Sequence, residues 1–347
     1  MAYTTIPKST AQFNTKLYTG TGSSNAITGV GFQPDFVWQK SRSAAEYHGL
    51  FDAVRGVLNY ITPNLDTQQQ ANAVSLTAFN SDGFTLGSNG QINASSSSNV
   101  SWNWKANGLG SSNTDGTINS TYTSANTTSK CSIVKYTGNG VIYGGIVGHG
   151  LGKVPKMMMV KNLSAGETDW MVYHASLGAT KNMRLNNTDA IATSSAMWNN
   201  TTPTSSLFYL SNNGNVNASG QDYVAYCFAD VPGFSKMGEY AANANADGPF
   251  IYLGFKPACI ILKQYNTNGS NWFLFDNKRA GFNIENYYLA PDSVGTEGTT
   301  DKLDMLSNGF KIKTSGSDVN GGDFIYMAWA ETPFVANSGE SIPTTAR

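Results

Sequence analysis

The sequence predicts an all-β protein of three tandem β-sandwich modules, jelly-roll or lectin-like, of about 90 to 100 residues each. Charged residues are only 13% of the 347 residues, whereas Gly numbers 36, and Asn, Ser and Thr abound, a composition that favours turns over helices. Aromatic residues make up 12%, enough to fill large cores. One layout of short apolar runs also occurs three times along the chain.

Each copy of the layout begins with a proline that is followed six positions later by lysine. The pairs are Pro34 and Lys40, Pro155 and Lys161, and Pro257 and Lys263. Proline is tolerated at the first residue of a strand, so each run is expected to be a strand. A glycine precedes each proline by three positions, at Gly31, Gly152 and Gly254.

Further strands follow in the same order in each copy. The second candidates end in Asp52, His174 and Asp276, and the closing candidates contain Trp104, Phe228 and Trp329. The separation from the proline to this closing aromatic is 70 residues from Pro34 to Trp104, 73 from Pro155 to Phe228 and 72 from Pro257 to Trp329. Such regular spacing favours three copies of one unit. An opening strand is expected at 16–20 and 133–138, and more faintly at 237–240.

The predicted boundaries follow from these repeats and from the composition between them. Module 1 is expected at 1–105, module 2 at 131–230 and module 3 at 233–332. Residues 106–130 are rich in Gly, Ser, Asn and Thr and are expected to form a linker. Residues 333–347 are expected to form a tail that adds little to a core.

Charge and hydropathy disfavour two classes of partner. The formal net charge of −1 gives no field toward nucleic acid or anionic membranes, so neither partner is expected. No apolar run reaches the length of a membrane span, and the N-terminus lacks a signal-peptide pattern, so cytoplasmic synthesis is expected. Cys131, Cys227 and Cys259 are too few for a disulfide framework and are expected to be buried thiols.

No catalytic, metal or cofactor motif emerges from the sequence. The three histidines, His48, His149 and His174, do not accompany a G-x-S-x-G elbow, and no CxxC or HxxxH spacing occurs. Asp52 and Asp276 occupy matching places and would suit a glycosidase carboxylate pair only if their modules faced each other. Because Arg55 and Arg279 follow them closely, local ion pairs are the favoured interpretation.

The layout resembles a family of virion surface proteins from tailed bacteriophages of marine and cyanobacterial type. The matching segments are 31–38, 50–52 with Arg55 and Gly56, 79–84, 148–152, 222–226 and 325–331. The resemblance implies a particle component of the tail-fibre, adhesin or head-decoration type, assembled in the host cytoplasm. It implies other virion proteins as partners and a homo-oligomer, with a trimer favoured because fibres are usually trimeric. It carries over no catalytic residue.

Three functions are therefore weighed. The first is a non-enzymatic surface protein that contacts the host, with Trp198, Tyr287 and Tyr288 as candidates for stacking on a host glycan. The second is a capsid decoration or connector protein whose surfaces bind other particle proteins. The third is a polysaccharide depolymerase, which would need carboxylates clustered in a groove.

Overall fold

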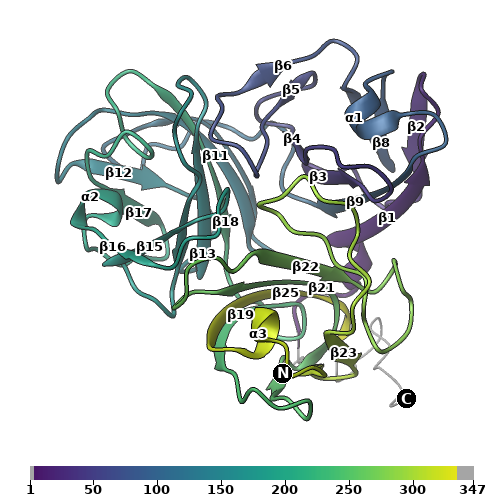
Figure 1. The fold of residues 1–347 in the computed structure, drawn as a ribbon. Coiled ribbons are helices and arrows are strands. Elements are labelled where there is room, and N and C mark those ends of the chain that lie inside the picture. The colour runs from purple at the N-terminus through teal and green to yellow at the C-terminus, as the bar shows by residue number, and fades with distance from the viewer. Residues whose placement is uncertain (1–3, 334–347) are drawn as a thin grey trace.

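A computed structural model describes residues 4–333. Antiparallel strands dominate it, and its α-helices are single turns, so the predicted all-β class is confirmed. Figure 1 shows three lobes of sheet around a common centre, with the early, middle and late parts of the chain in one lobe each. We call these lobes the first unit (13–104), the second unit (120–228) and the third unit (235–333).

The elements of the units follow in chain order, after a short 3₁₀ helix at Ser9–Ala11. The first unit holds β1 (Phe13–Thr19), β2 (Asn25–Thr28), β3 (Phe36–Ser41), β4 (Gly49–Asp52), β5 (Asn59–Tyr60), β6 (Gln70–Ala71), β7 (Leu76–Asn80), β8 (Gly83–Leu86), α1 (Gly90–Asn93) and β9 (Ser98–Trp104). The second holds β10 (Ser120–Asn126), β11 (Cys131–Thr137), β12 (Gly145–Gly148), β13 (Met157–Asn162), β14 (Met171–His174), β15 (Lys181–Arg184), β16 (Ala192–Thr193), α2 (Ser195–Trp198), β17 (Leu207–Leu210) and β18 (Asp222–Phe228). The third holds β19 (Ser235–Ala241), β20 (Phe250–Tyr252), β21 (Phe255–Gln264), β22 (Trp272–Asp276), β23 (Leu303–Leu306), β24 (Gly309–Ile312), α3 (Ser317–Asn320) and β25 (Asp323–Pro333).

The main sheets of the three units share one strand order. It is β1-β9-β3-β4 in the first unit, β11-β18-β13-β14 within the larger sheet of the second, and β19-β25-β21-β22 in the third. Register fixes equivalent positions, since Phe36, Met157 and Cys259 each pair with the last residue of the next strand. A smaller sheet accompanies each main sheet: β2-β8-β7, β12-β17 and β20-β24-β23.

Both faces of each main sheet are buried. Along β3, Phe36 and Trp38 face a core shared by all three units, whereas Val37 faces a separate core within the first unit. Met159 and Met158 on β13 divide in the same way between the shared core and the second unit's own core. This double burial explains why these strands are continuous apolar runs instead of alternating ones.

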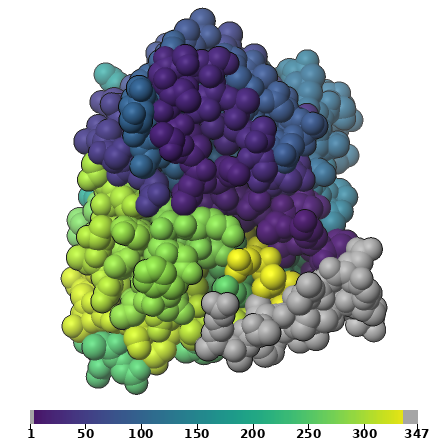
Figure 2. Space-filling view, turned by 90° about the vertical axis from the view of Figure 1, so that its right-hand side faces the viewer, coloured from purple at the N-terminus to yellow at the C-terminus, as the bar shows by residue number. Residues whose placement is uncertain are grey.

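The shared core is centred on the closing aromatics of the three units. The ring of Trp104 lies 6.2 Å from Phe228 and 5.1 Å from Trp329, and Phe228 lies 5.4 Å from Trp329. Residues that recur at regular spacing in the sequence therefore meet in one place. The units surround this cluster, so a tandem row of independent modules is the wrong picture of their arrangement. Figure 2 shows the first unit packed directly on the third.

Two expected segments differ in the structure. Residues 106–130 contain β10, which pairs with β11 at the edge of the second unit's sheet, so the tract is not a free linker. Thr121, Tyr122 and Thr123 are good strand formers whose signal was masked by the polar composition around them. Of the expected tail, Pro333 ends β25, and 334–347 lie outside the described residues.

The recurrent glycines and prolines have identifiable backbone roles. Gly31, Gly152 and Gly254 all have positive φ, of 92°, 64° and 83°, a conformation that a side chain disfavours. Pro34 and Pro155 stand two residues before their strands. Pro257 lies inside β21 at a register irregularity, where its missing N–H is tolerated.

A buried asparagine clamps a loop in each unit, at Asn93, Asn217 and Asn320. Each side-chain oxygen accepts from the backbone N–H that follows the opening strand, at Thr21 (2.9 Å), Asn139 (2.9 Å) and Asn243 (3.0 Å). Each amide nitrogen donates to carbonyl oxygens nearby, for example Asn93 to Gly87 O at 2.7 Å. The three residues are fully buried.

Replacing any one of these asparagines by Ala should lower the free energy of unfolding by about 1 to 3 kcal/mol, because buried backbone groups lose their partner. Urea denaturation of Asn93→Ala, Asn217→Ala and Asn320→Ala measures the loss. Gln68→Ala, which removes an exposed amide, should stay within about 0.5 kcal/mol of the parent. Equal stability of the Asn93→Ala and Gln68→Ala variants would contradict the clamp.

Candidate functional site

The three histidines are candidates for an acid–base site because the unperturbed imidazole titrates near neutral pH. His48, His149 and His174 are all buried. Burial lowers the pKa of each, to about 3 for His48 and about 4 for His174. The imidazoles of His48 and His174 are therefore neutral and serve as fixed hydrogen-bonding groups.

Asp52 and Arg55 form the expected local ion pair, and it reaches the second unit. The Arg55 Nε donates to Asp52 Oδ2, and the Tyr226 hydroxyl of β18 donates to the same oxygen at 2.6 Å. Arg55 Nη2 donates to Leu50 O at 2.8 Å. Because all of these groups are buried, the carboxylate is enclosed and unavailable to a substrate.

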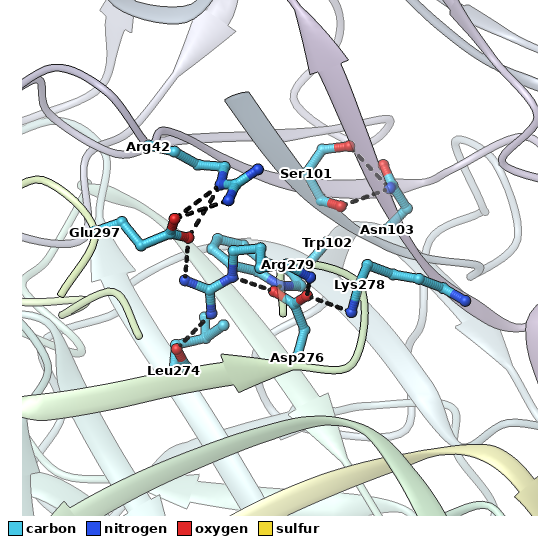
Figure 3. Close-up of polar contacts among 9 residues, drawn as sticks. All are labelled: Arg42, Ser101, Trp102, Asn103, Leu274, Asp276, Lys278, Arg279 and Glu297. Carbon is cyan, nitrogen blue, oxygen red and sulfur yellow. Dashed lines mark hydrogen bonds and ion pairs between the residues drawn. The ribbon is translucent and has the colours of Figure 1, made fainter. Parts of the chain in front are cut away.

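Asp276 and Arg279 repeat the arrangement between the third and first units, as Figure 3 shows. Arg279 Nε donates to Asp276 Oδ2 at 2.6 Å, and the Trp102 indole N–H of β9 donates to that oxygen at 3.0 Å. The guanidinium also lies 5.5 Å from the Trp102 ring centre. Glu297 extends the network by accepting from Arg279 at 3.2 Å and pairing with Arg42 of the first unit at 2.8 Å.

His174 takes the place of the aspartate in the second unit. Its Nε2 lies 3.4 Å from Tyr326 O on β25 of the third unit. The strand-ending residue of each unit thus contacts the closing strand of another: the first contacts the second, the second the third, and the third the first. The three contacts close a ring within one chain.

A second set of contacts runs around the ring in the opposite direction. His48, Trp170 and Trp272 are equivalent residues, each four positions before the strand end. Their ring nitrogens lie 2.9 Å from Ala290 O of the third unit, Thr62 O of the first and Arg184 O of the second, respectively. His48 Nδ1 accepts from the Trp38 indole, so Nε2 carries the proton that is donated to Ala290.

The recurrent lysines Lys40, Lys161 and Lys263 are fully buried. Each Nζ donates to backbone carbonyl oxygens, and two reach another unit: Lys161 donates to Asp66 O at 3.1 Å and Lys263 to Thr188 O at 3.3 Å. Burial lowers the pKa of all three to about 8. The lysines therefore hold loops in place.

Glu285 is a buried carboxyl group close to the charges of Asp276, Arg279 and Glu297. It is 2% exposed, and its Oε1 has no hydrogen-bond partner among residues 4–333. Burial, followed by the negative charge of Asp276, raises the pKa of Glu285 to about 8.

The pH dependence of folding should reveal this group. Since the folded-state pKa of Glu285 exceeds its unfolded value of 4.5, the folded protein keeps a proton that the unfolded chain has lost. Stability from this group falls as pH rises from about 4.5 to 8, by up to about 1.4 kcal/mol per pH unit. Urea denaturation across this range should show that the free energy of unfolding of Glu285→Gln increases relative to that of the parent as pH rises. A difference that is constant with pH would contradict the assignment, and the exposed Glu167→Gln should follow the parent.

Residues 4–333 hold neither a metal cluster nor a membrane-spanning helix. No group of three or more His, Cys, Asp or Glu side chains there is placed to hold a metal ion. The three cysteines are free and buried. In that same range no helix is long and apolar enough to cross a membrane.

The three aromatic residues predicted for glycan contact lie in different settings. Trp198 is 1% exposed and packs against Tyr173 in the second unit's core, so its prediction as a surface contact is wrong. The α2 turn buries it, which its loop-like sequence surroundings did not indicate. Tyr287 is half-buried, with the Arg42 guanidinium 5.9 Å from its ring centre. Tyr288 lines a surface pocket.

This pocket, which we call the Tyr288 pocket, has a volume of about 380 Å³. Its walls come from the loop after β21, the start of β22 and the α3 turn, and its lining includes Asn268, Asn271, Phe273, Tyr288, Ser317 and Asp318. The Phe273 and Tyr288 rings meet edge to face at 5.2 Å. Lys302 Nζ pairs with Asp318 and lies 5.3 Å from the Tyr288 ring centre.

The fold and these contacts define an all-β protein of three equivalent units closed around one core. A family model described as a domain of unknown function (DUF7483) matches residues 8–333, and the chain belongs to this family. The match treats all three units as one domain, in keeping with their shared core. No curated protein and no solved structure matches the chain.

The residues that join the units were the ones that sequence reasoning missed. Asp52, Asp276 and their arginines were expected as local pairs, but Tyr226, Trp102 and Glu297 were not linked to them. The available signal was positional. Trp102 and Tyr226 stand two residues before the closing aromatics Trp104 and Phe228, so they were already placed in equivalent strands.

Proposed function

We propose that the chain is a non-enzymatic structural protein of a bacteriophage particle surface, of the tail-fibre or adhesin type, that contacts the host. The observation that supports it best is that ionisable side chains form buried contacts between the units. Asp52, Asp276 and His174 each contact another unit through a hydrogen-bonding group, Arg279 lies over the Trp102 ring of the first unit, and all four are buried. A ring held this way suits a durable scaffold.

The arrangement also bears on assembly. One chain has three equivalent units around a centre, so a single copy supplies the kind of symmetry that fibres usually obtain from three chains. The trimer expected from the phage resemblance remains part of the proposal. Size-exclusion chromatography with light scattering tests the trimer directly, because it measures whether the mass in solution is that of three chains.

A second candidate is a capsid decoration or connector protein. Exposed apolar side chains favour it, because such groups commonly mark protein interfaces. Tyr143 is 79% exposed at the tip of a loop with Val141 and Ile142, and Phe250 and Tyr252 point outward from β20.

Immunogold labelling of intact particles of the phage that encodes the chain separates the candidates. Label on the tail supports the adhesin, and purified protein should then bind host cells without the particle. Label on the head shell supports decoration and overturns the adhesin. Particles without label overturn both, provided that the antibody recognises the purified folded chain.

A further inference from the structure

The same short segment lies beside the loop before the aromatic strand in each unit, and in two units a side chain joins them. In the first unit, Gln91 Nε2 donates to Tyr47 O at 3.2 Å. In the second, the Asp169 N–H donates to Asn215 Oδ1 at 2.7 Å. Gln91 and Asn215 are equivalent, since each stands two residues before the buried asparagine of its unit. These bonds bridge the segment and the loop.

In the third unit the equivalent residue is Asp318, two residues before Asn320, and it does not reach the loop. It pairs with Lys302 instead. The loop residue that corresponds to Tyr47 and Asp169 is Asn271, which makes no hydrogen bond within the described chain. The space that is bridged in the first two units is thereby left open as the Tyr288 pocket.

The open space has a firmly held frame. Lys263 Nζ donates a hydrogen bond to Ser270 O, and the Gly269 N–H donates to Thr188 O of the second unit at 2.9 Å. The Ala190 N–H donates to Asn268 Oδ1 at 2.8 Å. Because the second unit fixes this loop, the pocket is largely preformed, as small-molecule sites usually are.

The unpaired polar groups of the pocket are amides and hydroxyls, together with one carboxylate oxygen. The Asn268 Nδ2, the Asn271 amide, the Tyr288 hydroxyl and the Ser317 hydroxyl make no hydrogen bond to residues 4–333. The one charged lining residue, Asp318, pairs with Lys302 through Oδ2, and its Oδ1 has no hydrogen-bond partner among residues 4–333. Amides and hydroxyls offer both donors and acceptors, which is what sugar hydroxyl groups require, while the aromatic pair of Phe273 and Tyr288 adds apolar surface.

We infer that the Tyr288 pocket binds a neutral saccharide. The inference rests on the proposed function, because a host-surface glycan is the ligand that an adhesin would meet. A volume of about 380 Å³ is within the range of small-ligand sites and accommodates one or two sugar rings. The lining offers no unpaired cation for a phosphate or carboxylate group, which favours an uncharged ligand.

Saturation-transfer NMR on the full chain tests the inference with glucose, galactose, mannose, N-acetylglucosamine and their disaccharides at millimolar concentration. At least one sugar should receive saturation. Asn271→Tyr places in the third unit the residue type that the first unit has at Tyr47, and the exposed position leaves the fold intact. This variant should abolish the signal by filling the pocket.

A paired substitution isolates the tyrosine hydroxyl. Tyr288→Phe should weaken binding about 3- to 10-fold through the loss of one hydrogen bond. Tyr252→Phe removes a hydroxyl from an exposed tyrosine on β20 and should leave binding unchanged. No saturation from any sugar, or equal saturation in the parent and Asn271→Tyr, overturns the inference. The labelling of particles tests the proposed virion function independently of sugar binding. Labelled tails without sugar binding would overturn the inference about the pocket alone. Sugar binding without label on the particles would overturn the virion function alone.

Discussion

Arg279→Ala should lower the free energy of unfolding by about 3 to 5 kcal/mol, because the substitution leaves Asp276 buried without its cation. Both side chains of this pair are 0% exposed. The same change removes a hydrogen-bond donor from Glu297 and one from the Leu274 carbonyl. Urea or guanidinium denaturation at neutral pH measures the loss.

A matched arginine provides the control. Arg184 also pairs with two carboxylates, Asp169 at 2.8 Å and Asp189 at 2.5 Å, but its side chain is 42% exposed. Solvent screens such pairs, so Arg184→Ala should cost no more than about 1 kcal/mol. If the two arginine variants lose equal stability, the buried network between the third and first units does not have the role assigned to it.

The sequence predicted the strand content and most strands because short-range patterns encode them. Short apolar runs, Gly and Pro placement and aromatic enrichment are local properties. The prediction of a linker at 106–130 was wrong for the same reason. Strand β10 is polar, so its own sequence gives little strand signal, and it forms by pairing with β11. The candidate site was less accessible still. Trp198 and Tyr288 both lie in turn-rich sequence, and only the packing of α2 and α3 distinguishes a buried ring from a pocket wall.

The arrangement of the units was also encoded, although in a form that local reasoning could not use. The spacing of Trp104, Phe228 and Trp329 identified the repeats, but not that these residues would touch. Strands that are apolar on both faces were the available clue, because a free sandwich leaves one face of each sheet in water. Partner residues for those outer faces had to come from another unit.

Trp104→Ala should destabilise all three units together. Trp104 is 2% exposed and contacts the second and third units through Phe228 and Trp329. Removing a buried tryptophan costs about 3 to 5 kcal/mol, and a core shared by the units spreads that loss over the whole domain. Unfolding should remain a single cooperative transition at lower denaturant concentration.

Hydrogen exchange followed by mass spectrometry under native conditions locates the effect. In Trp104→Ala, the slowest amides of β9, β18 and β25 should all exchange faster by a similar factor, because they open only in global unfolding. Trp198→Ala removes a tryptophan from the second unit's own core. Amide exchange in β9 and β25 of this variant tests whether a loss of stability that originates in one unit also reaches the other two. Faster exchange in β9 alone after Trp104→Ala would mean that the first unit unfolds independently, and the closed ring would then have no energetic basis.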